Sequence, residues 1–127
     1  REVNLTNLHA PLELDLNNAW PIDKVDAIYT ANTFHIVSWQ LVEHFFAGVK
    51  QHLNDQGIVC IYGPFKYKGE FTSQSNNDFN RFLIERDPLS GIRDFAAVEL
   101  LAKQAGLTLI SDIAMPANNQ LLIFKRQ

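Results

Sequence analysis

The residues of this sequence that could carry chemistry stand at the ends of three apolar segments. Asp15 follows a short alternating segment, Asn32, Thr33 and His35 follow a second one, and Tyr62 closes a third. In open α/β sheets, ligands bind where the carboxyl ends of strands meet loops and helix N-termini. If the three segments are neighbouring strands, their polar residues form one site.

The residue types alone leave each of these roles open. Asp15 either binds a ligand or caps the turn that contains Asn17 and Asn18. His35 is either a proton acceptor or an ordinary half-buried histidine in front of a helix. Tyr62 belongs either to the site or to the rim of the core. The pattern supports an α/β domain with a polar site and goes no further.

Spacing excludes several other kinds of active site. The glycines stand at positions 48, 57, 63, 69, 91 and 106, too far apart for a G-x-G-x-x-G or Walker A loop. No G-x-S-x-G motif is present to supply a hydrolase nucleophile. The four histidines lack zinc-ligand spacing, and we interpret His44 and His52 as two solvated side chains on one helix.

The composition indicates one folded domain over residues 1–127, without a nucleic-acid or membrane surface. The chain is 46% hydrophobic and 20% charged, with a net charge of −3. Eleven basic residues against fourteen acidic ones form no basic stripe. No apolar run approaches the roughly 18 residues of a membrane helix, and no signal-peptide pattern is present. The single cysteine, Cys60, cannot form an internal disulfide and fits a cytoplasmic location.

Strands that alternate with helices are expected to position the polar residues. Their hydrophobic patterns predict strands at 11–16, 26–31, 58–62, 107–113 and 121–125. The third of these is apolar on both faces, which is typical of a strand between two helix layers. A short connection joins the last two strands and predicts an antiparallel hairpin at the end of an otherwise parallel sheet.

The first helix is expected between the second and third strands. Ser38 is its predicted N-cap, and its apolar positions continue at helical spacing as far as Leu53. Gly57 is expected to break this helix. Residues 63–74, with two glycines and one proline, are expected to form a loop after the third strand.

Two further helices are expected before the final hairpin. Ser75 and Asp78 have the spacing of a capping box, and Asp87-Pro88 is a stop signal for the helix that they would open. Asp94 is the predicted N-cap of the next helix. Gly106 stands where a left-handed residue usually ends such a helix.

Six segments of the chain, in order, resemble one bacterial protein family. They are LELDL (12–16), DAIYTANTFHI (26–36), IYGPFKYKGEFT (61–72), SNNDF (75–79), RDPLSGIRD (86–94) and MPANNQLLIF (115–124). The family is a domain of unknown function that is predicted to contain S-adenosylmethionine-dependent methyltransferases, with animal relatives called methyltransferase-like proteins. The combination of YGPF, SN..F, GIRD and MPANN is highly specific, whereas LELDL alone would mean little.

The resemblance implies an α/β fold: the C-terminal part of the Rossmann-like class I methyltransferase sheet, whose strand order is 3-2-1-4-5-7-6. The five predicted strands resemble, in chain order, the third, fourth, fifth, sixth and antiparallel seventh strands. The glycine-rich cofactor loop, and the acidic residue that holds the ribose, would then precede Arg1. We therefore expect the intact protein to be a methyltransferase and this chain to be an inactive fragment of it.

The resemblance also implies how S-adenosylmethionine would be bound. Asp15 falls where this superfamily places an acidic residue against the adenine amine, and the backbone amide of Leu16 could reach a ring nitrogen. Asn32 and Thr33 fall beside the methionine part of the cofactor. His35 is the best candidate for the base that deprotonates the methyl acceptor.

Five more side chains are candidates for the acceptor pocket: Tyr62, Asn76, Arg93, Asn118 and Asn119. The amides would orient the acceptor, a small molecule or a protein of unknown identity, and Arg93 would clamp an anionic group. The asparagines equally fit a role in satisfying loop backbone groups. No metal is expected.

Two further expectations concern the chain by itself. The alternative to an enzyme is a non-catalytic binding or interaction module that keeps the methyltransferase-like fold. Without the first two strands of the sheet, residues 26–31 form a bare edge with unpaired backbone groups. We expect the chain to associate as a homo-oligomer through this edge, although pairing of 11–16 with 26–31 would also satisfy it.

Overall fold

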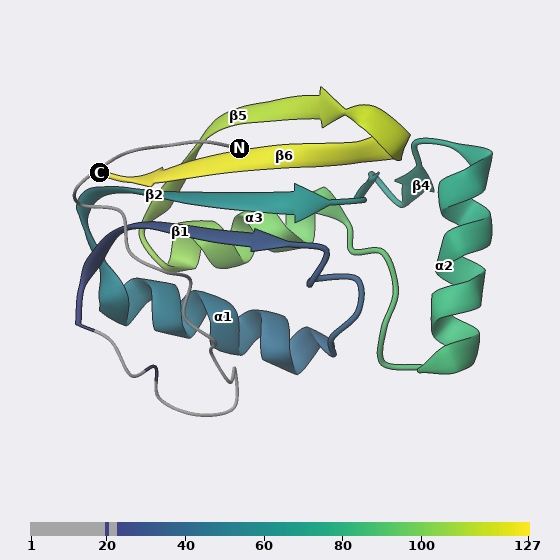
Figure 1. The fold of residues 1–127 in the computed structure, drawn as a ribbon, viewed down its shortest axis with the longest axis horizontal. Helices are drawn as coiled ribbons and strands as arrows, with labels where there is room; N and C mark the ends of the chain where they lie inside the picture. Colours follow the sequence, from purple (N-terminus) through teal and green to yellow (C-terminus); the bar gives the residue numbers. More distant parts are fainter. Residues whose placement is uncertain (1–19, 21–22) are drawn as a thin grey trace, which may run out of the picture.

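The computed structural model describes Trp20 and residues 23–127, so the predicted strand at 11–16 lies outside the described residues. The other four predicted strands are confirmed, three of them within a slightly longer element and 58–62 within a strand of 11 residues (Figure 1). The elements are β1 (Val25–Ala31), α1 (Trp39–His52), β2 (Leu53–Gly63), β3 (Lys66–Tyr67), β4 (Glu70–Phe71), α2 (Gln74–Arg86), α3 (Phe95–Gln104), β5 (Leu107–Met115) and β6 (Asn119–Arg126).

The main sheet has the strand order β1-β2-β6-β5. β1 and β2 are parallel, whereas β6 is antiparallel to both of its neighbours, β2 and β5. This order corresponds to 4-5-7-6 of the expected sheet. The predicted fold class, a parallel sheet that ends in an antiparallel hairpin, is therefore confirmed.

The first helix begins as predicted but ends earlier. The Ser38 side chain accepts a hydrogen bond from the Leu41 amide at 3.3 Å. Leu53 is already extended and begins β2, so the prediction that Gly57 breaks the helix is wrong. Gly57 lies inside β2 instead, where an added Cβ would come within 2.6 Å of the Leu53 side chain. Glycine is therefore suited to this position because it has no side chain to clash with Leu53, and not because it ends a helix.

The segment 63–74 was predicted to be a loop, but part of it forms strands. Its two short strands, β3 and β4, pair as an antiparallel hairpin. Lys68 and Gly69 both have positive φ, at 54° and 79°. Two consecutive left-handed residues are the geometry of a tight hairpin turn. The sequence signal was weak because lysine rarely occupies the first of these positions.

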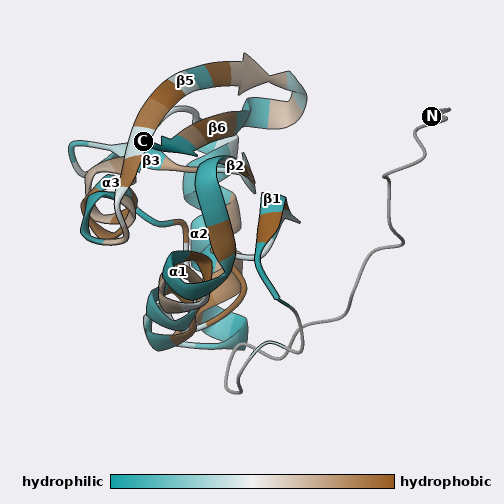
Figure 2. Cartoon of the chain, turned by 90° about the vertical axis from the view of Figure 1, so that its left-hand side faces the viewer, coloured by the Kyte–Doolittle hydropathy of each residue, from teal (hydrophilic) through white to brown (hydrophobic). Residues whose placement is uncertain are grey.

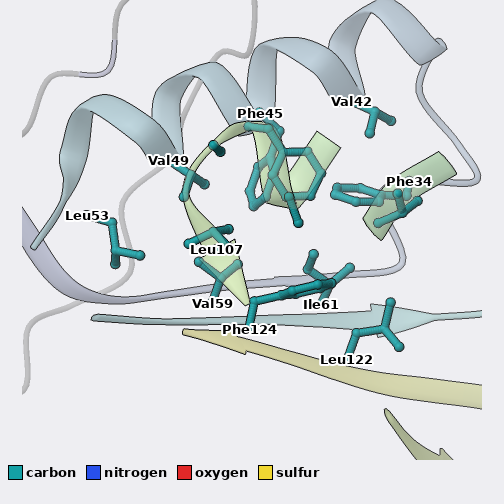
Figure 3. Packing of buried hydrophobic residues seen from close by; sticks show 14 of the residues in the cluster. Phe34, Val42, Phe45, Val49, Leu53, Val59, Ile61, Leu107, Leu122 and Phe124 are labelled. Atoms are coloured by element: carbon teal, nitrogen blue, oxygen red, sulfur yellow. The ribbon is translucent and has the colours of Figure 1, made fainter. Parts of the chain in front are cut away.

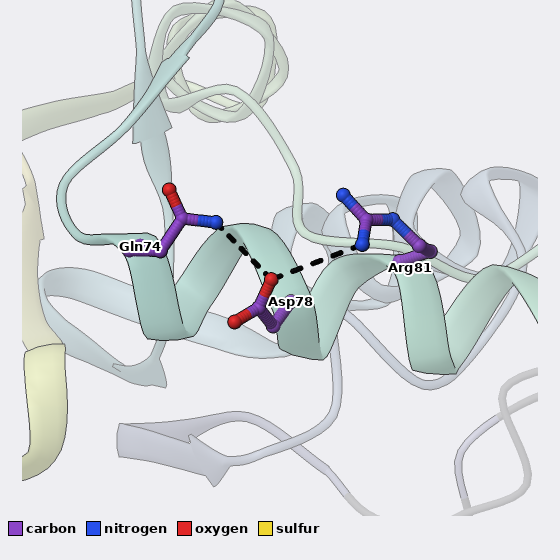
Figure 4. Close-up of polar contacts among 3 residues, drawn as sticks. All are labelled: Gln74, Asp78 and Arg81. Carbon is purple, nitrogen blue, oxygen red and sulfur yellow. Dashed lines mark hydrogen bonds and ion pairs between the residues drawn. The ribbon is translucent and has the colours of Figure 1, made fainter.

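The second helix starts one residue before the predicted cap. Ser73, not Ser75, accepts a hydrogen bond from the Asn76 amide, at 3.0 Å. Asp78 takes no part in a capping box. Its carboxylate accepts from the Gln74 side chain at 3.1 Å and lies 3.9 Å from the Arg81 guanidinium (Figure 4). These contacts lie along the surface of α2, and the predicted stop before Asp87 is confirmed.

The last helix and hairpin follow the sequence closely. Asp94 accepts from the Ala96 amide at 3.0 Å and caps α3. Gly106 has φ of 84° and follows the helix as predicted. The β5–β6 connection contains a short 3-10 turn, Pro116–Asn118, in which Ala117 and Asn118 adopt positive φ of 62° and 61°.

The core lies between one face of the sheet and the helices α1 and α3. Figure 3 shows Phe45 and Val49 of α1 packed toward Val59 of β2 and Phe124 of β6. α1 and α3 lie on the same side of the sheet in both views (Figures 1 and 2). Burial of these side chains is the main stabilisation of the domain.

The opposite face of the sheet has no helix over it within the described residues (Figure 2). It is nevertheless apolar, because alternate residues of β2 point to it, among them Ile58 and Cys60, and both are half-buried. The second helix layer that the sequence of 58–62 predicted is therefore not present in this part of the chain. None of the described helices is long and apolar enough to cross a membrane.

Candidate functional site

The site lies where the carboxyl ends of the parallel strands β1 and β2 meet. Ala31 pairs with Tyr62, and just beyond them the Asn32 backbone N–H donates to the Tyr62 carbonyl at 2.8 Å. The chain then turns through residues 33–37, where the Ile36 and Val37 amides both donate to the Thr33 carbonyl. This pairing brings the polar residues that follow β1 (Asn32, Thr33 and His35) close to Tyr62 at the end of β2.

Asn32 and Thr33, the predicted cofactor residues, differ in how far they are available to a ligand. Asn32 is exposed and left-handed, with φ of 55°, and its side chain makes no hydrogen bond to the described residues. The Thr33 hydroxyl accepts from Thr30 at 2.8 Å and donates to the Ala31 carbonyl at 3.1 Å. Thr33 therefore stabilises the end of β1, whereas Asn32 presents a free amide.

His35 is nearly buried, with 4% of its surface exposed. Its ring lies 5.7 Å from the ring of Phe79 on α2, and a Cβ added at Gly63 would be 3.6 Å from its Nδ1. Neither ring nitrogen is hydrogen bonded within the described region. The only fully buried side-chain nitrogen or oxygen without a partner there is Arg126 Nε. The His35 nitrogens therefore retain a narrow opening to the surface.

The surroundings of His35 keep its imidazole neutral. Burial first, and then the positive charge of Arg93, together lower its pKa from 6.5 to about 4. At neutral pH one ring nitrogen is thus a hydrogen-bond acceptor. A neutral imidazole fits the predicted role of proton acceptor, although its low pKa makes it a weak base.

Arg93, the predicted anion clamp, binds backbone carbonyls. Its Nε donates to the Phe34 carbonyl at 3.0 Å, and its Nη2 donates to Val37 at 2.7 Å and to Leu89 at 2.8 Å. The guanidinium also lies over the Trp39 ring, 5.6 Å from its centre. Only Nη1 remains for an anion, so most of the donor capacity of this side chain is committed to the fold.

Asn76 and Asn118 join the start of α2 to the β5–β6 turn. The buried Asn76 amide donates to the Asn118 carbonyl at 3.1 Å and to the Thr72 hydroxyl at 3.2 Å. The Asn118 amide donates to the Ser75 hydroxyl at 3.3 Å. These contacts match the loop-backbone role that the sequence left open.

Tyr62 and Asn119 form a second pair at the end of β2. The Asn119 amide donates to the Tyr62 hydroxyl oxygen and to the Pro116 carbonyl, both at 3.3 Å. Because the tyrosine oxygen accepts this bond, its own hydrogen remains available to a ligand. The pair can therefore present one O–H donor at the carboxyl edge of the sheet.

The structure thus brings eight of the ten predicted residues to this edge, while Asp15 and Leu16 lie outside the described residues. It adds Phe79, which contacts His35 and keeps 37% of its surface exposed. Phe79 lies on α2, and no local sequence pattern shows that it meets His35. No group of three or more potential metal ligands occurs among the described residues.

The fold is similar to several solved structures at low sequence identity. An O-methyltransferase family protein from Burkholderia thailandensis matches with a TM-score of 0.77 and 14% identity over 91% of this chain and 35% of that one. CalO1, a methyltransferase in calicheamicin biosynthesis solved in its SAH-bound form, matches with a TM-score of 0.72 and 15% identity. That match covers 91% of this chain and 34% of CalO1.

A structure described as a pericyclic reaction enzyme matches as well, with a TM-score of 0.73 and 14% identity over 93% of this chain and 32% of that one. The chain therefore spans about a third of the length of these proteins. Identities this low establish a shared fold and leave the chemistry to the site.

The sequence itself matches a protein family over nearly its whole length. The match covers residues 1–126, which include the segments YGPF, GIRD and MPANN and the whole of the site described above. On this match, the chain belongs to the family described as Protein of unknown function (DUF938).

Proposed function

We propose that the intact protein is an S-adenosylmethionine-dependent methyltransferase and that this chain supplies the acceptor side of its site. The observation that carries the proposal is the convergence of Asn32, His35 and Tyr62 at the carboxyl ends of two parallel strands. The strand order of the sheet, which matches the methyltransferase order 4-5-7-6, supports it. The free Cys60 is in keeping with action in the cytoplasm.

The residues at this edge fit the demands of methyl transfer. S-adenosylmethionine, when bound, supplies a methyl group on a sulfonium, and the protein must align the acceptor atom with it. The neutral His35 ring would accept a hydrogen bond from the acceptor N–H or O–H and take its proton as the methyl moves. Tyr62, through its available O–H, would orient the acceptor, and Asn119 would hold Tyr62.

Cofactor binding would require residues beyond this site. Asn32 offers a free amide to the methionine end, and Asp15 with Leu16 would reach the adenine. None of the six glycines in the 127 residues forms the glycine-rich loop that would hold the rest of the cofactor. We therefore infer that the intact protein carries this loop in a segment additional to the 127 residues.

Titration calorimetry with S-adenosylmethionine on this chain and on an N-terminally extended chain tests the proposal. The extended chain should bind the cofactor, and the short chain should bind it weakly or not at all. In the extended chain, Asp15→Ala should weaken binding by about 1–3 kcal/mol, the cost of a lost charged hydrogen-bond partner. Tight binding by the short chain, or unchanged affinity in a folded Asp15→Ala variant, would contradict these roles.

The role of His35 needs a separate test in the extended protein. His35→Ala should lower turnover of an acceptor, identified by screening small molecules and proteins, far more than it lowers cofactor affinity. Tyr62→Phe, which removes only the O–H donor, should raise KM for the acceptor. An equal loss of turnover and cofactor affinity in His35→Ala would identify His35 as a structural residue.

A binding or interaction module that lacks chemistry is the second candidate. Two observations favour it: the Asn76 side chain donates to the Asn118 carbonyl and the Asn118 side chain to the Ser75 hydroxyl, and the open sheet face is apolar. An extended chain that binds neither S-adenosylmethionine nor its demethylated product, yet retains the fold by circular dichroism, would support this candidate over the enzyme.

A further inference from the structure

The segment between α2 and α3, residues 87–94, lies against the turn that carries His35. Its Gly91 amide donates to the His35 carbonyl at 3.0 Å, and Arg93 donates to the carbonyls of Phe34 and Val37 on either side. Three of the four carbonyls from Phe34 to Val37 are thus held from a segment more than fifty residues away in sequence. Such a contact network fixes a turn that its own few internal bonds would leave mobile.

The segment is itself held firmly in place. The Ile92 amide donates to the Asn80 side chain at 2.8 Å, and the Ser90 hydroxyl donates to the Leu83 carbonyl at 2.8 Å, so α2 anchors it at two points. Gly91 has φ of 140°, and a Cβ there would lie 3.2 Å from Asn80 Oδ1. Only glycine fits this conformation easily, which lets the Gly91 amide reach His35.

We propose that Arg93 is the positioning residue for His35: it locks the 33–37 turn through its Phe34 and Val37 carbonyls and keeps a positive charge beside the imidazole. The planar guanidinium suits this task because Nε and Nη2 can donate to two carbonyls at once. A lysine could keep the charge but could not reproduce both bonds. This assignment replaces the anion clamp as the main role of Arg93.

The charge has a second consequence for the imidazole. Among the groups that face His35, Phe79 comes from α2 and Gly63 from β2, and neither is titratable. Arg93 is the one described charged residue that shifts its pKa, in the same direction as burial. Arg93 thus holds the ring in place and in its neutral form. The consequence for turnover rests on the proposed function, whereas the geometry and charge state do not.

Two variants separate the two effects, with Arg81→Gln, an exposed arginine on α2, as the matched control. Arg93→Gln removes both the charge and the fork, which is the pair of donors Nε and Nη2 that bind the Phe34 and Val37 carbonyls. Arg93→Lys keeps the charge and removes the fork. The first readout is the His35 pKa from an NMR titration of the imidazole. The second is amide hydrogen exchange at Ile36 and Val37, which close the turn on Thr33.

Arg93→Gln should raise the His35 pKa from about 4 toward 6.5, because it removes a like charge that disfavours the imidazolium, while the larger effect of burial remains. It should also speed exchange at Ile36 and Val37 at least tenfold. Arg93→Lys should speed exchange similarly while the His35 pKa stays near its original value. Arg81→Gln should change neither readout.

Unchanged exchange and an unchanged His35 pKa in a folded Arg93→Gln protein would overturn the proposal. If Arg93→Gln does not fold, Arg93→Lys decides, since slow exchange at Ile36 and Val37 in that variant would equally refute the fork. Both readouts are made without cofactor or acceptor. They therefore hold whether or not the protein proves to be a methyltransferase.

Discussion

The two faces of the sheet are nearly equal in composition but differ in what covers them. In β2, Val59 and Ile61 point to the face under α1 and α3 and are fully buried, whereas Ile58, Cys60 and Tyr62 on the other face are only half-buried. Strands of an α/β fold are apolar on both faces when both are covered. The comparison indicates that this sheet is built for a second layer that the described residues do not supply.

The largest expected effect comes from truncating one residue on each face of the same strand. Leu122 of β6 is 0% exposed, and Leu121 beside it faces the opposite side and is half-buried. Leu122→Ala should lower the free energy of unfolding by about 2–5 kcal/mol, whereas Leu121→Ala should cost only about 1 kcal/mol. Urea unfolding of both variants measures the difference. Equal losses would show that the second face is packed in solution.

A smaller effect on the free energy of unfolding is expected from His35, whose imidazole is buried near the carboxyl ends of β1 and β2. The pKa of His35 falls from 6.5 to about 4 on folding, so the unfolded chain binds this proton more tightly. The free energy of unfolding should therefore fall by about 3 kcal/mol as pH drops from 6.5 to 4. The contribution of His35 should level off about one pH unit above 6.5, where the unfolded chain has also lost the proton.

Urea unfolding at a series of pH values tests the role of His35. His35→Gln should flatten the fall between pH 6.5 and 4, whereas His52→Gln, which leaves His35 in place, should keep it. A fall that persists in His35→Gln would assign the pH dependence to other groups.

The smallest effect on stability is expected at β1, the edge strand of the sheet. Within the described residues β1 pairs only with β2, and Tyr29 is 66% exposed. We propose that two or more copies associate through this edge, where unpaired backbone groups favour strand pairing. Tyr29→Lys should change the free energy of unfolding by less than about 0.5 kcal/mol yet shift the chain toward monomer.

Light scattering across a concentration series would measure this association. Ile110→Lys, at an exposed position of the opposite edge strand β5, is the matched control and should leave association unchanged. A wild-type chain that stays monomeric at high concentration would refute association through β1.

Much of the site was predictable because its residues lie at strand ends. Asn32, His35 and Tyr62 were identified from the apolar runs before them, and pairing of β1 with β2 brings these runs side by side. The hydrogen-bond partners were not predictable in the same way. Arg93 contacts Phe34 and Val37 across more than fifty residues, and no local pattern encodes such a contact.

The sequence by itself determined the four strands of the main sheet, the caps Ser38 and Asp94, the left-handed Gly106 and the antiparallel last hairpin. These follow from periodicity and from hydrogen bonds between residues a few positions apart. The resemblance to a family added the strand order. Only the tertiary structure decided that α1 ends before Gly57, that Ser73 caps α2, and that Arg93 binds the His35 turn. Distant partners decide two of these cases, since Leu53 pairs with Val25 of β1 and Arg93 binds carbonyls more than fifty residues away. The choice of Ser73 over Ser75 is between two nearby serines that the sequence pattern does not separate.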